Sequence, residues 1–70
     1  MANPYEQLTN EAMADCAAGR YAEAENKLNQ VLAVEKQCGV APGGSKAMYW
    51  LLVARYKGDE KQAMREWCQM

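Results

Sequence analysis

Apolar residues recur at three- and four-residue spacing along much of the chain, which is the periodicity of amphipathic helices. A first stripe consists of Tyr5, Leu8, Ala12 and Cys16. A second consists of Ala24, Leu28, Val31, Leu32 and, as its one polar member, Glu35. The segment 47–54 is apolar nearly all round, and its alanine, methionine and leucine content favours a buried helix. The pattern predicts helices from residue 4 to the glycine at 19, over 21–36 and 46–57, and a short one after residue 59.

The starts of these helices are marked by capping residues. Asn3 followed by Pro4 predicts the first N-terminus, because proline at the first helical position loses no needed hydrogen bond. Ser45 predicts the cap of the third helix. Asp59, with Gln62 three residues later, predicts the cap of the last one.

The ends of the helices are marked by glycines. Gly19 and Gly58 follow periodic segments and adopt the left-handed conformation cheaply. Residues 38–45 hold three of the five glycines and one of the two prolines, so they are predicted to form a loop. We therefore predict one all-α domain over residues 1–70 with four helices. Two antiparallel helical hairpins, at about 4–37 and 46–70, stack as a short solenoid or a small bundle.

The two hairpins repeat one another in sequence. The matched pairs are Gly19 with Gly58, Ala24 with Ala63, Leu28 with Trp67, and Ala12 with Leu51. The segment 19–24, Gly-Arg-Tyr-Ala-Glu-Ala, resembles the Gly-Asp-Tyr-x-Glu-Ala turn of the tetratricopeptide repeat (TPR). The resemblance extends over about residues 5–70. It implies a stack of helical hairpins that binds a protein or peptide.

The chain also departs from the tetratricopeptide pattern. The two glycines are farther apart than the family period of about 34 residues, so the loop at 38–45 is read as an insertion. Glu11 and Asp15 stand where the family has leucine and tyrosine, and Lys36 stands in place of a closing proline. No capping helix follows Trp67, so we expect the last hairpin to leave an apolar face open to another chain. The alternative is a self-contained bundle.

The resemblance also implies which residues bind a partner. Positions counted back from the two glycines line the inner groove of tetratricopeptide proteins, and Trp67 belongs to the open face. The set is Thr9, Met13, Cys16, Met48, Leu52, Arg55, Tyr56 and Trp67. The alternative is that Met13, Met48 and Leu52 form core, because apolar stripes at helical spacing usually face one.

Charge and composition exclude several classes of partner. The net charge is −1 and no basic stripe is present, so no nucleic-acid partner is expected. The longest apolar run is too short to span a bilayer, and the N-terminal residues do not resemble a signal peptide. Cys16, Cys38 and Cys68 lack CxxC spacing and are expected to be reduced, buried thiols in a cytoplasmic protein.

The sequence contains few candidates for catalytic residues. The chain has no histidine, which removes the usual general base near neutral pH and the commonest metal ligand. Glu11 and Asp15 lie one helical turn apart, and we expect both carboxylates to be solvated. The sequence therefore predicts neither an enzyme nor a cofactor or metal site.

The expected function is protein–protein interaction. The leading hypothesis is an adaptor, scaffold or small chaperone that binds a protein or peptide through the helical groove or the open hairpin face. By analogy of size and repeat type, it resembles the co-chaperones of type III secretion. The alternative is a structural protein that associates with its own copies.

Overall fold

A computed structural model describes residues 4–70 of the chain. The described part contains four α-helices, one turn of 3-10 helix and no strand. The elements are α1 (Pro4–Ala17), α2 (Tyr21–Gln37), η1 (Pro42–Gly44), α3 (Lys46–Arg55) and α4 (Glu60–Cys68). The predicted all-α class with four helices is confirmed. The third helix is shorter than predicted, since it ends at Arg55 rather than Lys57.

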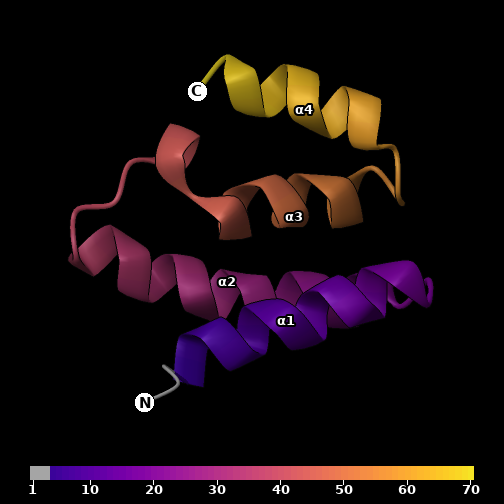
Figure 1. Ribbon diagram of the computed structural model, residues 1–70, viewed down its shortest axis with the longest axis horizontal. Helices are drawn as coiled ribbons and strands as arrows, with labels where there is room; N and C mark the ends of the chain where they lie inside the picture. The colour runs from indigo at the N-terminus through magenta and orange to yellow at the C-terminus, as the bar shows by residue number, and fades with distance from the viewer. Residues whose placement is uncertain (1–3) are drawn as a thin grey trace.

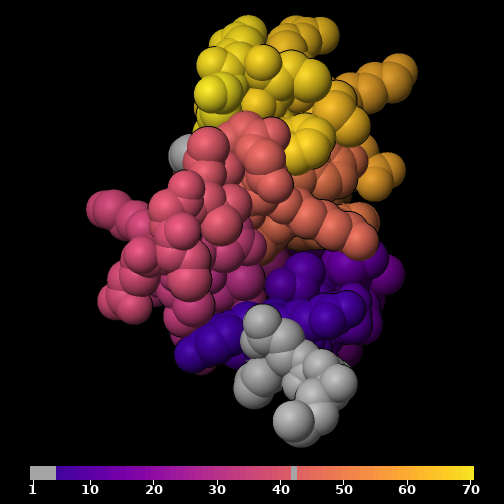
Figure 2. Space-filling view, turned by 60° about the vertical axis from the view of Figure 1, so that its left-hand side comes forward, coloured from indigo at the N-terminus to yellow at the C-terminus, as the bar shows by residue number. Residues whose placement is uncertain are grey.

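The helices stack in chain order (Figure 1). α1 packs on α2, α2 on α3, and α3 on α4, while α1 also touches α3. The turns that join α1 to α2 and α3 to α4 lie at the same end of the molecule, and α4 lies at the opposite edge of the stack from α1. Seen from the side, the loop around η1 covers the other end, and η1 meets α4 (Figure 2).

Two of the predicted N-caps form as expected. The Ser45 hydroxyl accepts a hydrogen bond from the Met48 backbone N–H at 3.1 Å. The Asp59 carboxylate likewise accepts from the N–H of Gln62 at 3.1 Å. Both contacts satisfy donors that the first turn of a helix leaves unpaired. The cap predicted at Asn3 lies outside the described residues.

The two hairpin turns close in the same way, but the second is one residue longer. At the end of α1, Gly19 has φ 83° and the N–H of Arg20 donates to the carbonyl of Asp15 at 2.8 Å. This is a Schellman motif. At the end of α3 the left-handed residue is Lys57, with φ 55°, and the N–H of Gly58 donates to the carbonyl of Val53 at 2.8 Å. Gly58 itself also has positive φ, at 93°.

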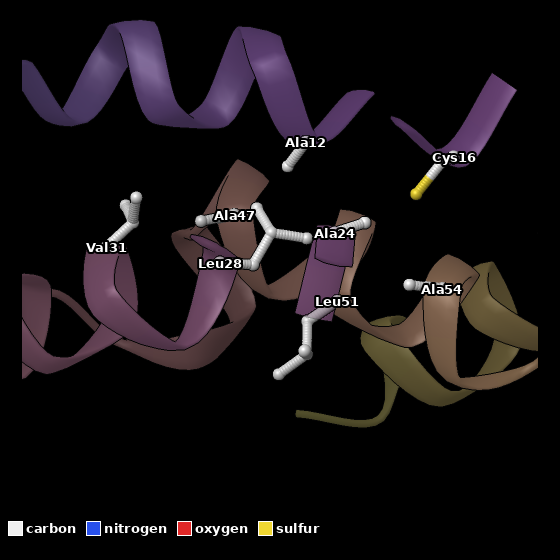
Figure 3. Packing of buried hydrophobic residues seen from close by; sticks show 8 residues of the cluster. All are labelled: Ala12, Cys16, Ala24, Leu28, Val31, Ala47, Leu51 and Ala54. Atoms are coloured by element: carbon white, nitrogen blue, oxygen red, sulfur yellow. The ribbon is translucent and has the colours of Figure 1, made fainter. Parts of the chain in front are cut away.

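The main core lies where α1, α2 and α3 meet (Figure 3). It consists of Ala12, Cys16, Ala24, Leu28, Val31, Ala47, Leu51 and Ala54. Half of these residues are alanines, which let the helix axes approach closely, and Leu28 fills the space between them with no exposed surface. Tyr5, the first residue of the first apolar stripe in the sequence, lies in α1 but is 38% exposed and does not belong to the core.

A smaller cluster holds α4 against α3. Its buried members are Leu52, Val53 and Ala63, and half-buried aromatic rings surround them. The Tyr49 ring meets Trp50 edge to face and Trp67 at a tilt of 48°, with centroid distances of 5.4 Å to each. The second hairpin thus rests mainly on aliphatic and aromatic packing.

The expectation of an open apolar face on the last hairpin is wrong. The exposed residues of α4 are mostly polar, and they are Glu60, Lys61, Gln62, Met64, Arg65 and Cys68. Its apolar residues Ala63 and Trp67 turn inward onto α3. The outer side of α4 is therefore mostly polar, and its apolar side packs on α3.

Candidate functional site

The residues predicted from the first hairpin differ in accessibility. Cys16 is 7% exposed and belongs to the core, so its side chain contributes little to the surface. Thr9 is half-buried and its hydroxyl donates to the Tyr5 carbonyl at 3.0 Å. Met13 is half-buried and lines a hollow in the surface. Of the three, Met13 is the one with an accessible and apolar side chain.

The residues predicted from the second hairpin are dispersed. Leu52 is fully buried, and Trp67 packs against Tyr49. The Tyr56 hydroxyl donates to the Glu66 carboxylate at 2.6 Å, and this hydrogen bond raises the pKa of Tyr56. The remaining two, Met48 and Arg55, point to α2: Met48 packs against the main core, and Arg55 lies 4.0 Å from the carboxylate of Glu25. The eight predicted residues do not form one surface.

The structure instead brings Met13 together with residues that the sequence did not single out. All four helices contribute to what we call the inter-hairpin hollow. Its principal lining residues are Met13, Cys16, Tyr21, Trp50, Val53 and Glu60. Met13 comes from the flank of α1, Trp50 and Val53 from α3, Tyr21 from the first turn of α2, and Glu60 from the first turn of α4.

Repeat register could not have found this set. Met13 and Cys16 border the hollow from α1, whereas Trp50 and Val53, which are not their matched positions, border it from α3. Equivalent positions such as Met13 and Leu52 therefore face different surroundings. The available signal was the pair Trp50 and Val53, three residues apart on a helix that is apolar nearly all round.

A close approach between α2 and the second turn shapes one end of the hollow. A Cβ atom on Gly58 would lie 2.8 Å from the hydroxyl oxygen of Tyr21. Glycine at this position therefore allows the Tyr21 ring to lie against the turn. The same residue also has a positive φ that side chains rarely adopt.

A separate feature of the first hairpin is an ionic cluster around one buried carboxylate, whose partners are partly exposed. Asp15 is 4% exposed, and the expectation that it is solvated is wrong. Its carboxylate accepts hydrogen bonds from Arg20 Nε at 3.0 Å and from Lys27 Nζ at 2.6 Å. The hydrogen bond from Lys27 is the main cause that lowers the pKa of Asp15, and the same bond raises the pKa of Lys27. Glu11 lies at the outer side of this cluster, with its Oε1 atom 3.9 Å from Nζ of Lys27.

This cluster acts as a structural clamp. It joins α1, the turn and α2. Arg20 and Lys27 supply the positive charges that a buried carboxylate needs as partners. Every buried side-chain nitrogen and oxygen in the described part of the chain has a hydrogen-bond partner.

A second hollow lies where the loop crosses between α2 and α3. Leu32, Val40 and Met48 supply its apolar wall. Ser45 is buried there, and its hydroxyl donates to the carboxylate of Glu35 while it caps α3. This explains why Glu35 interrupts the apolar stripe of α2: the carboxylate anchors the start of the next helix.

The thiols lie in two different environments. Cys16 is buried as expected, and burial raises the pKa of its thiol. Cys38 and Cys68 are exposed, so the expectation that all three are buried is wrong. All three are free. Within residues 4–70 no group of three or more His, Cys, Asp or Glu side chains is arranged to hold a metal ion.

No helix in the described part combines the length and apolar character needed to cross a membrane. Comparison with known proteins found no matching family model, no matching curated protein and no matching solved structure.

Proposed function

We propose that this chain is a small protein-binding module that receives a short segment of another protein in the inter-hairpin hollow. The observation that carries the proposal is the hollow itself, which all four helices build and which contains the half-buried side chains of Met13, Tyr21 and Trp50. Aromatic residues and methionine are enriched in protein interfaces. Methionine in particular adapts to different apolar partners.

The stacking of the helices supports a repeat-like mode of binding. Each helix packs mainly on its chain neighbour, and α1 also meets α3. This order is compatible with the resemblance to the tetratricopeptide repeat in residues 19–24, which implies binding of a protein or peptide through an inner groove. On this proposal the module is an adaptor or a small chaperone, with the type III secretion co-chaperones as a narrower analogy.

Self-association is the competing proposal. It finds less support in the outer side of α4, because Glu60, Lys61, Gln62 and Arg65 make that side polar. The most exposed large apolar residues, Tyr5, Val40, Met64 and Met70, belong to different segments. Apolar residues scattered singly are normal on a monomer.

The free thiols at Cys38 and Cys68 favour a reducing compartment such as the cytoplasm.

A peptide-display selection on the immobilised chain tests the proposal. The affinities of the peptides enriched on the wild type are then measured by fluorescence titration for the wild type, for Met13→Ala and for the matched control Met64→Ala. Met64 is an exposed methionine on α4 outside the hollow, 43% accessible.

We expect Met13→Ala to weaken binding about tenfold, as the loss of one well-packed interface side chain does. Met64→Ala is expected to leave the affinity unchanged. Failure to enrich any peptide, or enriched peptides that respond to Met64→Ala and not to Met13→Ala, contradicts the proposal.

A further inference from the structure

The inter-hairpin hollow is lined by groups that attract cations. Glu60 is the one charged residue among those that line it, and no lysine or arginine lines it. Two aromatic side chains, Tyr21 and Trp50, border it as well. Aromatic faces attract a nearby cation through the ring quadrupole, most strongly when the ring is tryptophan. Met13 adds a polarisable thioether next to them.

The arginines at this end of the molecule are already engaged by other carboxylates. Arg20 contacts Asp15 at 2.9 Å and Glu23 at 3.4 Å. Arg55, the last residue of α3, lies 4.0 Å from Glu25. Lys57 is exposed in the turn and is not a lining residue. Among the described residues, no lysine or arginine nitrogen lies within salt-bridge distance of the Glu60 carboxylate, although Glu60 also lines a separate hollow with Lys61 and Arg65.

The inner wall of the hollow is also close to negative charge. Burial raises the pKa of the Cys16 thiol, and the charges of Asp15 and Glu25 raise it further. Those two carboxylates are paired with Arg20, Lys27 and Arg55, so within residues 4–70 Glu60 is the one unpaired carboxylate at the hollow. The charge of the hollow is thus complementary to a basic group.

We propose that the partner segment inserts an arginine side chain into the inter-hairpin hollow, where the guanidinium lies against Trp50 and Tyr21 and pairs with Glu60. This proposal rests on the proposed function and specifies its ligand. Arginine fits better than lysine because its planar guanidinium stacks on aromatic rings and pairs with a carboxylate through two hydrogen bonds. Its aliphatic stem suits the apolar contacts of Met13 and Val53.

The test uses the peptides enriched on the full-length wild-type chain. The arginine of each peptide is replaced by citrulline, which keeps the shape and removes the charge, and affinities are measured for wild type, Glu60→Gln and Glu6→Gln. Glu6 is an exposed residue in the first turn of α1 and is not a lining residue, so its variant is a matched control for the change in net charge. Thermal melts establish that both variants remain folded.

We expect the enriched peptides to share an arginine and to lose about tenfold in affinity on replacement by citrulline. That difference is expected to shrink to about two- to threefold in Glu60→Gln and to stay tenfold in Glu6→Gln.

Peptides that bind in a Met13-dependent way but carry no basic residue overturn this inference and leave the binding function standing. Lysine enriched in place of arginine overturns the choice of arginine. A citrulline effect that is equal in wild type and Glu60→Gln overturns the role of Glu60. If no peptide is enriched, the binding function and this inference both fall.

Discussion

The two hairpins have the same architecture but are closed by different interactions. In the first, Asp15 is buried at the helix–helix interface and receives hydrogen bonds from Arg20 and Lys27. The residue that matches Asp15 in the second hairpin is Ala54, which is buried without charge. There α3 and α4 meet through Leu52, Val53, Ala63 and the aromatic rings around them.

The two turns also differ in the residue at the left-handed position. The first turn has glycine at its left-handed position, and open space surrounds the site of a Cβ on Gly19. The second turn has Lys57 at that position and then Gly58 against Tyr21. The same helical-hairpin architecture is therefore compatible with ion pairs between the two helices (the ionic closure of the first hairpin) and with apolar packing between them (the apolar closure of the second). The two should respond differently to pH, to truncation of side chains and to changes in the turn.

The largest expected effect is on the apolar closure. Leu52→Ala removes a fully buried side chain, and we expect a loss of about 2–5 kcal/mol in the free energy of unfolding. Since a domain of this size has about 3–5 kcal/mol to lose, much of the variant should be unfolded. Urea titration followed by circular dichroism measures this, with the exposed Asn29→Ala as control. A loss below about 0.5 kcal/mol contradicts the assignment of Leu52 to the core.

The next effect is on the ionic closure, and it depends on pH. The folded-state pKa of Asp15 lies below its ordinary value of 3.8, so its ion pairs stabilise the fold fully above that value. Their contribution is lost as the pH falls through the lowered pKa. We expect Asp15→Asn to melt below the wild type at pH 7, and the gap to narrow below about pH 4.

Thermal melts of wild type and Asp15→Asn between pH 2 and pH 7 measure this narrowing. The exposed, uncharged exchange Asn29→Ala is the reference, because its small effect on the melting temperature is expected to be nearly independent of pH over the same range. A gap between wild type and Asp15→Asn that stays constant down to pH 2 would show that the charge of Asp15 does not stabilise the first hairpin.

A smaller effect is the difference in free-energy cost between a glycine-to-alanine substitution in the first turn and one in the second. Gly58→Ala and Gly19→Ala both place a side chain at positive φ, which costs about 1–2 kcal/mol. Gly58→Ala should cost about 1 kcal/mol more, because its Cβ also meets the Tyr21 hydroxyl at 2.8 Å. In a Tyr21→Phe background the excess should vanish, since the nearest ring carbon is then an ordinary contact at 3.6 Å.

Denaturant titrations of the four variants, Gly19→Ala, Gly58→Ala, Tyr21→Phe and the double variant, complete this cycle. Equal costs for Gly58→Ala with and without the Tyr21 hydroxyl would contradict the close approach between α2 and the second turn.

The smallest expected effect is a gain. Lys57 adopts φ 55°, a conformation that costs a side-chain-bearing residue free energy and costs glycine little. We expect Lys57→Gly to stabilise the chain by about 0.5–1 kcal/mol. The exchange at the matched position, Gly19→Lys, should destabilise it. Differential scanning calorimetry measures both, and a lower melting temperature for Lys57→Gly would contradict the assignment of Lys57 as the left-handed residue of the turn.

Much of the fold followed from local signals in the sequence. The caps at Ser45 and Asp59 and the stops at Gly19 and Gly58 depend on interactions within one turn of helix. The stripe of Ala24, Leu28 and Val31 is also buried as predicted. The helix count and class followed from these signals alone.

The candidate site could not be predicted in the same way. Of the residues proposed from repeat register, Met13 lines the inter-hairpin hollow with an accessible side chain, while Leu52 and Cys16 are core. Whether a flank of α3 faces α1, α2 or α4 depends on how the helices are rotated against each other. Periodicity on one helix specifies an apolar side but not which neighbour each part of it meets.

The sequence by itself determined the number of helices and most of their boundaries, because caps, glycines and three- to four-residue periodicity act over a few residues; the end of α3, at Arg55 rather than Lys57, is an exception. Tertiary structure decided the rest. Asp15 is buried because Lys27, twelve residues later, and Arg20 from the turn supply the charges that its carboxylate requires. The inter-hairpin hollow exists because four helices each contribute one flank to it. Both features require contacts between elements, which local patterns do not encode.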